Sequence, residues 1–509
     1  MAQLAARLDY QASRAGVAAR ASALAILNRW GRGAFRYLTL SLGAQASPAT
    51  TVELQLSHVY FTADPNNDRL QVHSGYFRSS DDLLNRIWYA GAYTGQLCTV
   101  AANTSVNHTR LLEGIGWSND QQVTGLNPTD SILSDGAKPT VNIRAYGSDT
   151  YHLWTITGFA EYVLASSDVA FGRQYWTQIV RGLEGTYPYV NPTTGLFNGT
   201  RRQDWGRVGQ AGQNIALNAL YRHALQLAAR VSGLVSNNST AQASQWQTMA
   251  ERVKASQMNS FSTALEGRQL YPQDGNVAAI NFNLTNSRAQ ALTIVENLSR
   301  RLTQYGSPAP ELPGSISAFV GSQELRAQFT ASPATATRAL ALLRTQWGYM
   351  LNAFSNSTSV EGYSADESLN YGFYPGGQGF ISYVHAWSTG PVYPLLTRII
   401  GLRVSAIDVP AEDGDWVFQP AVVGSGLTFA QGGFRTKDGN FAASWKISRG
   451  RFYATDSVPA GSSGTFYVPV LDVGKETTVK VDGKRVRSAV LLTASFDVRM
   501  LREAAIISR

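Results

Sequence analysis

The hydrophobic pattern of this chain changes its period twice, and this change constrains the fold more than any other feature. Residues 36–62 alternate between apolar and polar positions, which is typical of half-buried strands. From residue 79 to about residue 400, apolar residues recur at helical spacing. After residue 410, short alternating runs are separated by glycine turns. The sequence therefore predicts a mainly α protein with an N-terminal β segment and a C-terminal β domain.

Several long helical patterns, separated by turns rich in Gly, Pro and Asn, make up the central region. The first follows Ser79-Ser80-Asp81-Asp82, residues that favour the N-cap position. Further patterns cover residues 149–165, 214–232, 244–264, 287–305, 322–330 and 334–351. Because no fixed-period repeat is visible, helical hairpins closed into a barrel are favoured over a solenoid.

The C-terminal region reads as an all-β module. Short strands are predicted at residues 441–448, 451–455, 464–470 and 477–484. Strands of this length with glycine turns between them are typical of a β-sandwich.

Composition excludes several classes of protein. A length of 509 residues suggests about three domains. Cys98 is the one cysteine, which excludes a disulfide scaffold, and aromatic residues at 11% are too frequent for a disordered chain. No stretch approaches the ~18 apolar residues of a membrane span. The net charge of +8 comes from scattered basic residues, so we expect neither nucleic acid nor a membrane as a partner.

The sequence signals that indicate a cellular compartment disagree with one another. Eight Asn-x-Ser/Thr acceptors, which favour a secreted glycoprotein, occur at Asn103, Asn107, Asn198, Asn237, Asn238, Asn283, Asn297 and Asn356. The first 36 residues carry six arginines and one acidic residue, and they lack the apolar core of a secretory leader. This composition resembles an organelle transit peptide, but a helix or a start inside a longer secreted parent also accounts for it. We expect the last of these, and therefore an extracellular protein.

Common catalytic and cofactor motifs are missing from the sequence. There is no Gly-rich phosphate loop, no Gly-x-Ser-x-Gly elbow and no His-Glu-x-x-His. The six histidines show no metal-ligand spacing, so we expect no cofactor and no metal site built from His or Cys. Oxygen ligands such as those of calcium leave no simple pattern, and this expectation does not extend to them.

Four glycine-rich loops instead combine aromatic residues with carboxylates and amides. Sugar sites need this combination, because aromatic faces stack on pyranose rings while carboxylates bind hydroxyls and supply acid-base catalysis. The loops cover residues 130–138, 201–207, 360–367 and 385–391.

These loops and the segment at the start of the first helical pattern resemble those of a known protein family. The segment Ser74-Gly75-Tyr76-Phe77-Arg78-Ser79-Ser80-Asp81-Asp82-Leu83-Leu84-Asn85-Arg86-Ile87-Trp88 is similar to the first barrel helix of fungal α-L-rhamnosidases of glycoside hydrolase family 78. The four loops and Ser388-Thr389-Gly390-Pro391 follow in the family's order, over residues 36–430. The resemblance implies a six-hairpin (α/α)6 barrel, one helix short in this chain, flanked by β-sandwiches. It also implies that terminal α-L-rhamnose is hydrolysed from glycosides or polysaccharides with inversion.

With this resemblance the expected domains are an N-terminal extension over 1–35, for which a helix is one interpretation, a β segment over 36–78, the six-hairpin domain over 79–405 and a β-sandwich over 406–509. The resemblance also implies roles for individual residues. Glu361 matches the general base that activates water in an inverting hydrolase. The implied sugar contacts are Asp135, Asp204, Trp205, His385 and Trp387.

The sequence departs from the family after Lys138. The family's general acid lies a few residues beyond this position, but here residues 139–147 lead directly into a segment like a later helix. We therefore expect the acid carboxylate and roughly one barrel helix to be missing. Asp149 is a poor replacement, because Ser148-Asp149 before a helical pattern is typical of an N-cap.

Two alternatives stay open. A non-catalytic carbohydrate-binding relative would keep the pocket without the acid. A uronyl hydrolase or polysaccharide lyase on the same fold would use basic residues against uronates, and Arg201, Arg202 and Arg207 are available for that role.

Overall fold

The computed structural model describes residues 75–98, 148–200, 204–207, 209, 211–236, 239–258, 271–332, 336–372, 374, 381–404, 409–471, 476–481, 484–490 and 495–501. The strands expected over 36–62, Asp135 and the segment after Lys138 lie outside these residues.

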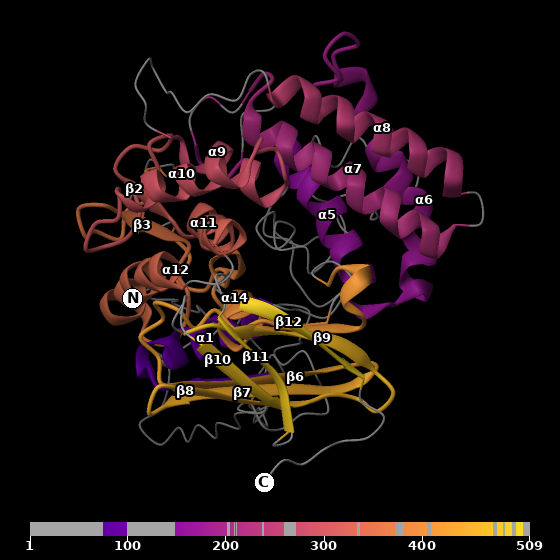
Figure 1. Ribbon diagram of the computed structural model, residues 1–509. Helices are drawn as coiled ribbons and strands as arrows, with labels where there is room; N and C mark the ends of the chain where they lie inside the picture. Colours follow the sequence, from indigo (N-terminus) through magenta and orange to yellow (C-terminus); the bar gives the residue numbers. More distant parts are fainter. Residues whose placement is uncertain are drawn as a thin grey trace, which may run out of the picture.

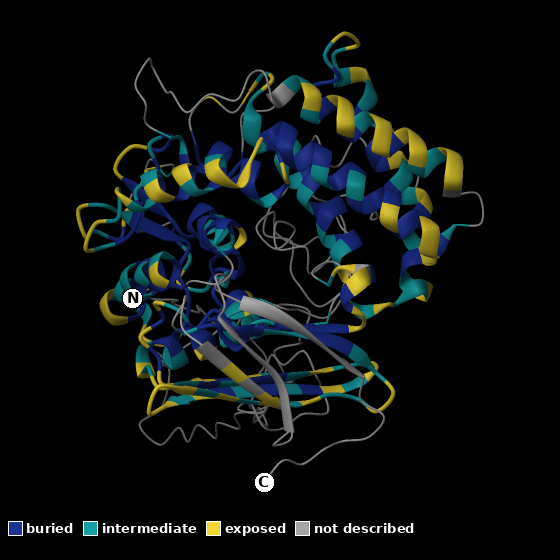
Figure 2. Cartoon of the chain, viewed as in Figure 1, coloured by how far each residue is buried: buried dark blue, intermediate teal, exposed yellow. Residues whose placement is uncertain are grey.

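Helices form an arc above a β layer (Figure 1). The first half of the arc contains α5 (Asp149–Ser166), α6 (Val169–Glu184), α7 (Ile215–Val235), α8 (Ser239–Met258) and α9 (Gln273–Asn281), with the 3-10 turn η1 (Tyr187–Tyr189) after α6. Helix α7 packs against α5, α8 and α9. Figure 2 shows α5 and α7 mostly buried and the outer side of α8 exposed, so the helices form an inner and an outer row.

The second half of the arc closes back toward α1 (Asp82–Cys98). It contains α10 (Arg288–Ser299), α11 (Ala318–Ala331) and a long helix that runs through α12 (Thr337–Leu342), η2 (Leu343–Trp347), α13 (Gly348–Met350) and η3 (Leu351–Ser355). The last helix comprises α14 (Val392–Pro394) and η6 (Leu395–Ile400), after the short turn η5 (Ala386–Ser388). The small hairpin of β2 (Ser315–Ser317) and β3 (Gly362–Ser364) lies beside these helices.

Polar side chains fix where the helices begin. The Asp81 carboxylate accepts the backbone N–H groups of Leu83 and Leu84 at the start of α1, at 3.0 and 3.3 Å. Ser148 and Asn214 cap α5 and α7 in the same way. These caps satisfy first-turn N–H groups that have no partner within the helix, which is why the polar residues before these three apolar patterns predicted the starts well.

Two four-stranded sheets form the β layer. One has the order β1 (Gly75–Ser79), β6 (Phe429–Thr436), β7 (Gly439–Ser448) and β8 (Arg451–Ser457); the other has β12 (Ser495–Leu501), β9 (Ser463–Pro469), β5 (Trp416–Phe418) and β4 (Leu402–Arg403). The hairpin of β10 (Glu476–Val481) and β11 (Lys484–Val490) and the turn η7 (Ala411–Asp413) complete this part. Phe452 of β8 and Phe466 of β9 lie 6.5 Å apart between ring centroids, so aromatic residues of the two sheets meet in the β-sandwich.

Strand β1 joins the beginning of the described chain to the C-terminal β region. It pairs antiparallel with β6, from Gly75 opposite Phe434 to Ser79 opposite Ala430. One apolar core cluster accordingly includes Trp88 of α1, Trp347 of the long helix, and Trp416 and Trp445 of the sheets, whereas a second cluster lies among α5 to α9.

Some element boundaries differ from the sequence prediction, since the helices expected to begin at residues 244 and 322 begin at Ser239 and Ala318. The helix expected over 287–305 ends at Ser299, and the one expected over 334–351 continues to Ser355 through π-helical turns. Helices α6 and α9 have no counterpart in the sequence prediction, and the run predicted as one strand over 477–484 is divided between β10 and β11. Among the described residues, no helix has the length and apolar content needed to cross a membrane.

Candidate active site

A cavity opens inside the arc of helices. Its empty volume is about 530 Å³, including space open to solvent at its mouth. It is lined by Thr150, Tyr151, Trp154, Asp204, Trp205, Arg207, Ala216, Leu220, Asp274, Val277, Ala278, Phe282, Phe319, Val320, Gln323 and Trp387. Aromatic walls with a few polar groups are typical of a small-molecule site.

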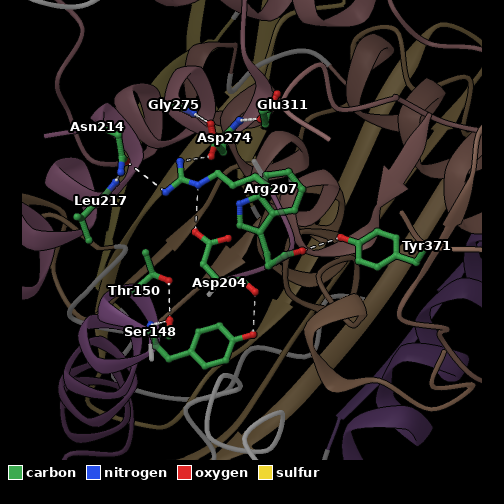
Figure 3. A network of polar contacts seen from close by, with 12 residues as sticks. Ser148, Thr150, Asp204, Arg207, Asn214, Leu217, Asp274, Gly275, Glu311 and Tyr371 are labelled. Atoms are coloured by element: carbon green, nitrogen blue, oxygen red, sulfur yellow. Dashed lines mark hydrogen bonds and ion pairs between the residues drawn. The ribbon is translucent and has the colours of Figure 1, made fainter. Parts of the chain in front are cut away.

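An arginine and two carboxylates form the polar side of this cavity (Figure 3). Arg207 Nε lies 3.1 Å from Asp204 Oδ2, and Arg207 Nη1 donates to Asp274 Oδ2 at 2.5 Å. Arg207 Nη2 also donates to Asn214, the cap of α7, at 3.2 Å. The cavity wall at residues 204–207 is therefore tied to the starts of α7 and α9.

Glu311 joins the cluster from the loop before β2. Its two carboxyl oxygens accept the backbone N–H groups of Gln273 and Asp274, at 2.9 and 2.6 Å, so it caps the first turn of α9. Burial and the charge of Asp274 raise the pKa of Glu311 to about 8, against the effect of the two N–H donors. Burial likewise raises the pKa of Asp204 to about 6, with Arg207 opposing the shift.

Glu361 lies buried beside the aromatic wall, with 1% of its surface exposed. One carboxyl oxygen accepts the Tyr374 hydroxyl and the other accepts the Ser382 N–H at 3.0 Å. Trp387 Nε1 donates to the Glu361 carbonyl at 2.8 Å, so this carboxylate is fixed directly behind a tryptophan that lines the cavity.

His385 completes this group. Its ring stacks on Trp387 with centroids 4.2 Å apart, and its Nε2 lies 3.8 Å from Glu361 Oε1. Burial lowers the pKa of His385 to about 3, so the imidazole is neutral at pH 7.

Tyr371 connects the Glu361 side of the site to the Asp204 side. Its hydroxyl donates to the carbonyl of Trp205 at 2.8 Å. Its ring lies against Gly362, where a Cβ would come within 2.8 Å of the ring. The backbone next to each carboxylate therefore contacts the same tyrosine.

The structure brings most of the expected site residues into one region. Asp204, Trp205 and Trp387 line the cavity, whereas Glu361 and His385 lie behind Trp387 and do not line it. Asp135, Arg201 and Arg202 lie outside the described residues. Ser148 caps α5, and Asp149 Oδ2 accepts the Thr200 N–H at 2.8 Å.

Four residues of this site were missed by the sequence prediction: Asp274, Glu311, Tyr371 and Tyr374. Asp274 is followed by a glycine and Glu311 lies between two prolines, in segments that read as ordinary turns. No short spacing links them to Asp204, because their contacts come from tertiary packing. No group of His, Cys, Asp or Glu among the described residues is arranged to hold a metal ion.

Helical hairpins in two rows around an aromatic and acidic cavity, with packed β-sheets beneath, are the architecture of six-hairpin (α/α)6 glycosidases, and this chain has that fold. More specifically, its fold is similar to that of α-L-rhamnosidases, among them one of glycoside hydrolase family 78. Residues 414–483 also match the family model described as the bacterial α-L-rhamnosidase C-terminal domain.

Solved structures support this likeness. The α-L-rhamnosidase from Dictyoglumus thermophilum aligns over 84% of this chain and 49% of its own, with 16% identity and a TM-score of 0.61. The Streptomyces avermitilis α-L-rhamnosidase complexed with L-rhamnose aligns over 83% and 41%, with 16% identity and a TM-score of 0.57. The family 78 rhamnosidase of Bacillus sp. GL1 aligns over 76% and 42%, with 20% identity and a TM-score of 0.55.

This chain spans less than half the length of each of these three proteins. No curated protein sequence matches it.

Proposed function

We propose that this protein is a glycoside hydrolase of the rhamnosidase type, which removes terminal α-L-rhamnose from glycosides or polysaccharides with inversion. The observation that carries the proposal is the pairing of an aromatic, acidic cavity with Glu361 fixed behind its tryptophan wall. The names of the structural neighbours support α-L-rhamnose as the sugar.

In this proposal, Glu361 is the general base. Its carboxylate is held by the Tyr374 hydroxyl and the Ser382 N–H, which orient it and favour its ionised form. Because His385 is neutral, it does not neutralise Glu361 by forming an ion pair. An ionised carboxylate next to the site can take a proton from the attacking water.

The other expected residues bind the sugar. Trp205 and Trp387 offer aromatic surface to the apolar face of a pyranose, and Asp204 offers a carboxyl group. His385 supports the Trp387 ring by stacking. Asp135 is proposed as a further sugar contact. We also propose domain boundaries after residues 35, 78 and 405. The acceptor sequences for N-glycosylation support an extracellular location.

A non-catalytic carbohydrate-binding protein is the second candidate. It is favoured by one observation, that Glu361 does not line the cavity. The lyase alternative has less support, since Arg207 is already engaged by Asp204 and Asp274 and is not free to bind a uronate.

Hydrolysis of an aryl α-L-rhamnoside tests the proposal. The wild-type chain should release rhamnose, and NMR of the first product should show the β-anomer, as inversion requires. Glu361→Gln should lower kcat by about 10²–10⁴-fold with little change in KM, because it removes the base. The control is Glu296→Gln, at an exposed carboxylate paired with Arg300, which should leave the rate unchanged. Rhamnose binding by calorimetry without any turnover would favour the second candidate instead.

A further inference from the structure

The acidic cluster beside the cavity contains more carboxyl groups than cations. Asp204, Asp274 and Glu311 have 5%, 9% and 8% of their surface exposed, and Arg207 is the cation bonded to the first two. Arg301, the other nearby cation, is shared between Glu311 and the buried Glu324. Buried carboxylates that repel one another retain protons at a higher pH than isolated ones do. Glu311, with a pKa of about 8, and Asp204, with a pKa of about 6, therefore each keep a proton at a higher pH than an isolated carboxyl group does.

The hydrogen bonds distinguish Asp204 from the other two carboxyl groups. Four of the six carboxyl oxygens accept an N–H hydrogen bond, and each such contact favours a bare oxygen over an O–H. The donors are Arg207 for Asp274 Oδ2, Gly275 for Asp274 Oδ1, Asp274 for Glu311 Oε1 and Gln273 for Glu311 Oε2. Both oxygens of Asp204 are buried without a hydrogen-bond partner; Oδ2 lies 3.1 Å from Arg207 Nε, and Oδ1 does not face the arginine (Figure 3).

We propose that Asp204 carries a proton on Oδ1 and is the general acid of this chain, protonating the leaving glycosidic oxygen in place of the carboxylate expected after Lys138. The proposal rests on the proposed function, because it assigns the second carboxyl group of the same reaction. Asp204 has the position for this role, since it lines the cavity beside Trp205.

Asp204 and Glu361 are both linked to Tyr371 through the residue that follows each of them. Tyr371 contacts the carbonyl of Trp205, next to Asp204, and the backbone of Gly362, next to Glu361. The charges of Glu361 and Asp204 also both raise the pKa of Tyr371, so both carboxyl groups lie near this residue. An inverting pair needs two separate carboxyl groups, about 6.5–9.5 Å apart, to admit the sugar carbon and a water.

Hydrolysis moves one proton from water to Glu361 and another from Asp204 to the leaving oxygen. Glu361 takes a proton from water as the water oxygen bonds to the anomeric carbon. The bond from this carbon to the glycosidic oxygen breaks, and its electron pair stays on that oxygen, which receives the proton from Asp204 Oδ1. Asp204 is left ionised beside Arg207, which stabilises the new charge. Solvent later removes the proton from Glu361 and supplies one to Asp204, so both groups regain their starting states.

The titration of Asp204 is consistent with this role. Burial and the charge of Asp274 raise its pKa, whereas Arg207 and the nearby Trp205 N–H lower it, and the result is about 6. Tyr151 also faces this residue, but its hydroxyl donates to the Asp204 carbonyl rather than to the carboxyl group. Activity should therefore fall as the pH rises above about 6, when the acid has lost its proton.

Leaving-group dependence in Asp204→Asn tests the proposal. For 4-methoxyphenyl α-L-rhamnoside, whose leaving group needs protonation, kcat/KM should fall by about 10²–10⁴-fold. For the 2,4-dinitrophenyl rhamnoside, whose leaving group departs without a proton, the loss should be at least about tenfold smaller. The alkaline limb of the pH profile should also disappear, whereas Glu296→Gln, at an exposed carboxylate, should keep it.

A uniform loss for both substrates would show that Asp204 only binds or positions the sugar, and would overturn the inference while the proposed function stands. Absence of turnover in the wild-type chain would instead overturn the proposed function itself. If Asp204→Asn fails to fold, the wild-type chain supplies the measurement. A general acid predicts a weak dependence of its kcat/KM on leaving-group pKa, and a steep dependence would overturn the inference.

Discussion

Arg207 shows how much a single residue contributes to the site. It lies three positions after Asp204 in sequence, but it also bonds to Asp274 and to Asn214. A loop, the start of α9 and the start of α7 are thereby held together by one guanidinium. Its planar fork of donors allows these contacts at once, which a lysine would not.

Arg207→Met should destabilise the protein, and the effect should grow with pH. The variant leaves buried carboxylates without their cation, which typically costs about 3–5 kcal/mol at neutral pH. Without Arg207, Asp204 becomes harder to ionise, so its folded-state pKa rises further above the unfolded value. A carboxyl group whose pKa is raised on folding stabilises the folded state at low pH, and this stabilisation is lost as the pH rises through its folded-state pKa. Urea unfolding should therefore show a smaller deficit at pH 5 than at pH 8.

The matched control is Arg300→Met, which removes an arginine with 68% of its side chain exposed and an exposed Glu296 partner. Surface pairs of this kind contribute about 0–1 kcal/mol. An equal deficit for the two variants, or one at Arg207 independent of pH, would contradict the role assigned to the buried cluster.

At the scale of elements, the β-sheets depend on close approach at particular glycines. Gly464 of β9 lies opposite Trp416 of β5 in a parallel ladder, and a Cβ there would overlap the Trp416 ring. Trp416 is fully buried, so it has no free space into which to move. Sheet pairing and core packing therefore both require glycine at this position.

Gly464→Ala should accordingly destabilise the protein by more than about 2 kcal/mol, through overpacking of the core. Gly233→Ala in α7 is the opposite case, because a Cβ there meets nothing within 4 Å. It should stabilise the helix by about 0.5–1 kcal/mol, since alanine loses less conformational entropy than glycine. Thermal melts of the two variants check the pair, and a neutral Gly464→Ala would show that the sheets are packed less tightly than described.

At the scale of the whole molecule, the helical arc and the β layer share one core. Trp445 of β7 donates from Nε1 to the carbonyl of Ile399 in the last helix, at 2.8 Å. Strand β1, just before α1, is an edge strand of the same sheet. The first and last helices of the arc are thus anchored on the C-terminal β-sheet, whereas α5 to α8 pack into the second cluster.

Trp445→Phe should expose this coupling. It leaves the buried Ile399 carbonyl without its donor, which costs about 1–3 kcal/mol. Hydrogen exchange should then speed up in β6–β8 and also in η6 and α1, with little change in α6 and α8. Faster exchange in the β-sheets alone would mean that the two regions unfold independently.

Local patterns in the sequence determined the order of elements and most helix starts. Capping residues such as Asp81, Ser148 and Asn214 act within a few residues of the helices they begin, so a linear reading finds them. The same applies to the strands of the C-terminal domain, whose alternation and glycine turns are local. Helix ends were harder to place, as at Ser299, because tertiary contacts rather than nearby residues decide where the last turn stops.

Only the tertiary structure decided how the candidate site is assembled. Asp204, Trp205 and Trp387 were found from the sequence because aromatic and acidic residues stand together in their loops. The Glu311 cap on α9 could not be found in this way, since its partners lie 37 and 38 residues away. Burial is likewise a property of the packed chain, and it is burial that raises the pKa of Asp204 and leaves one of its oxygens with a proton to give.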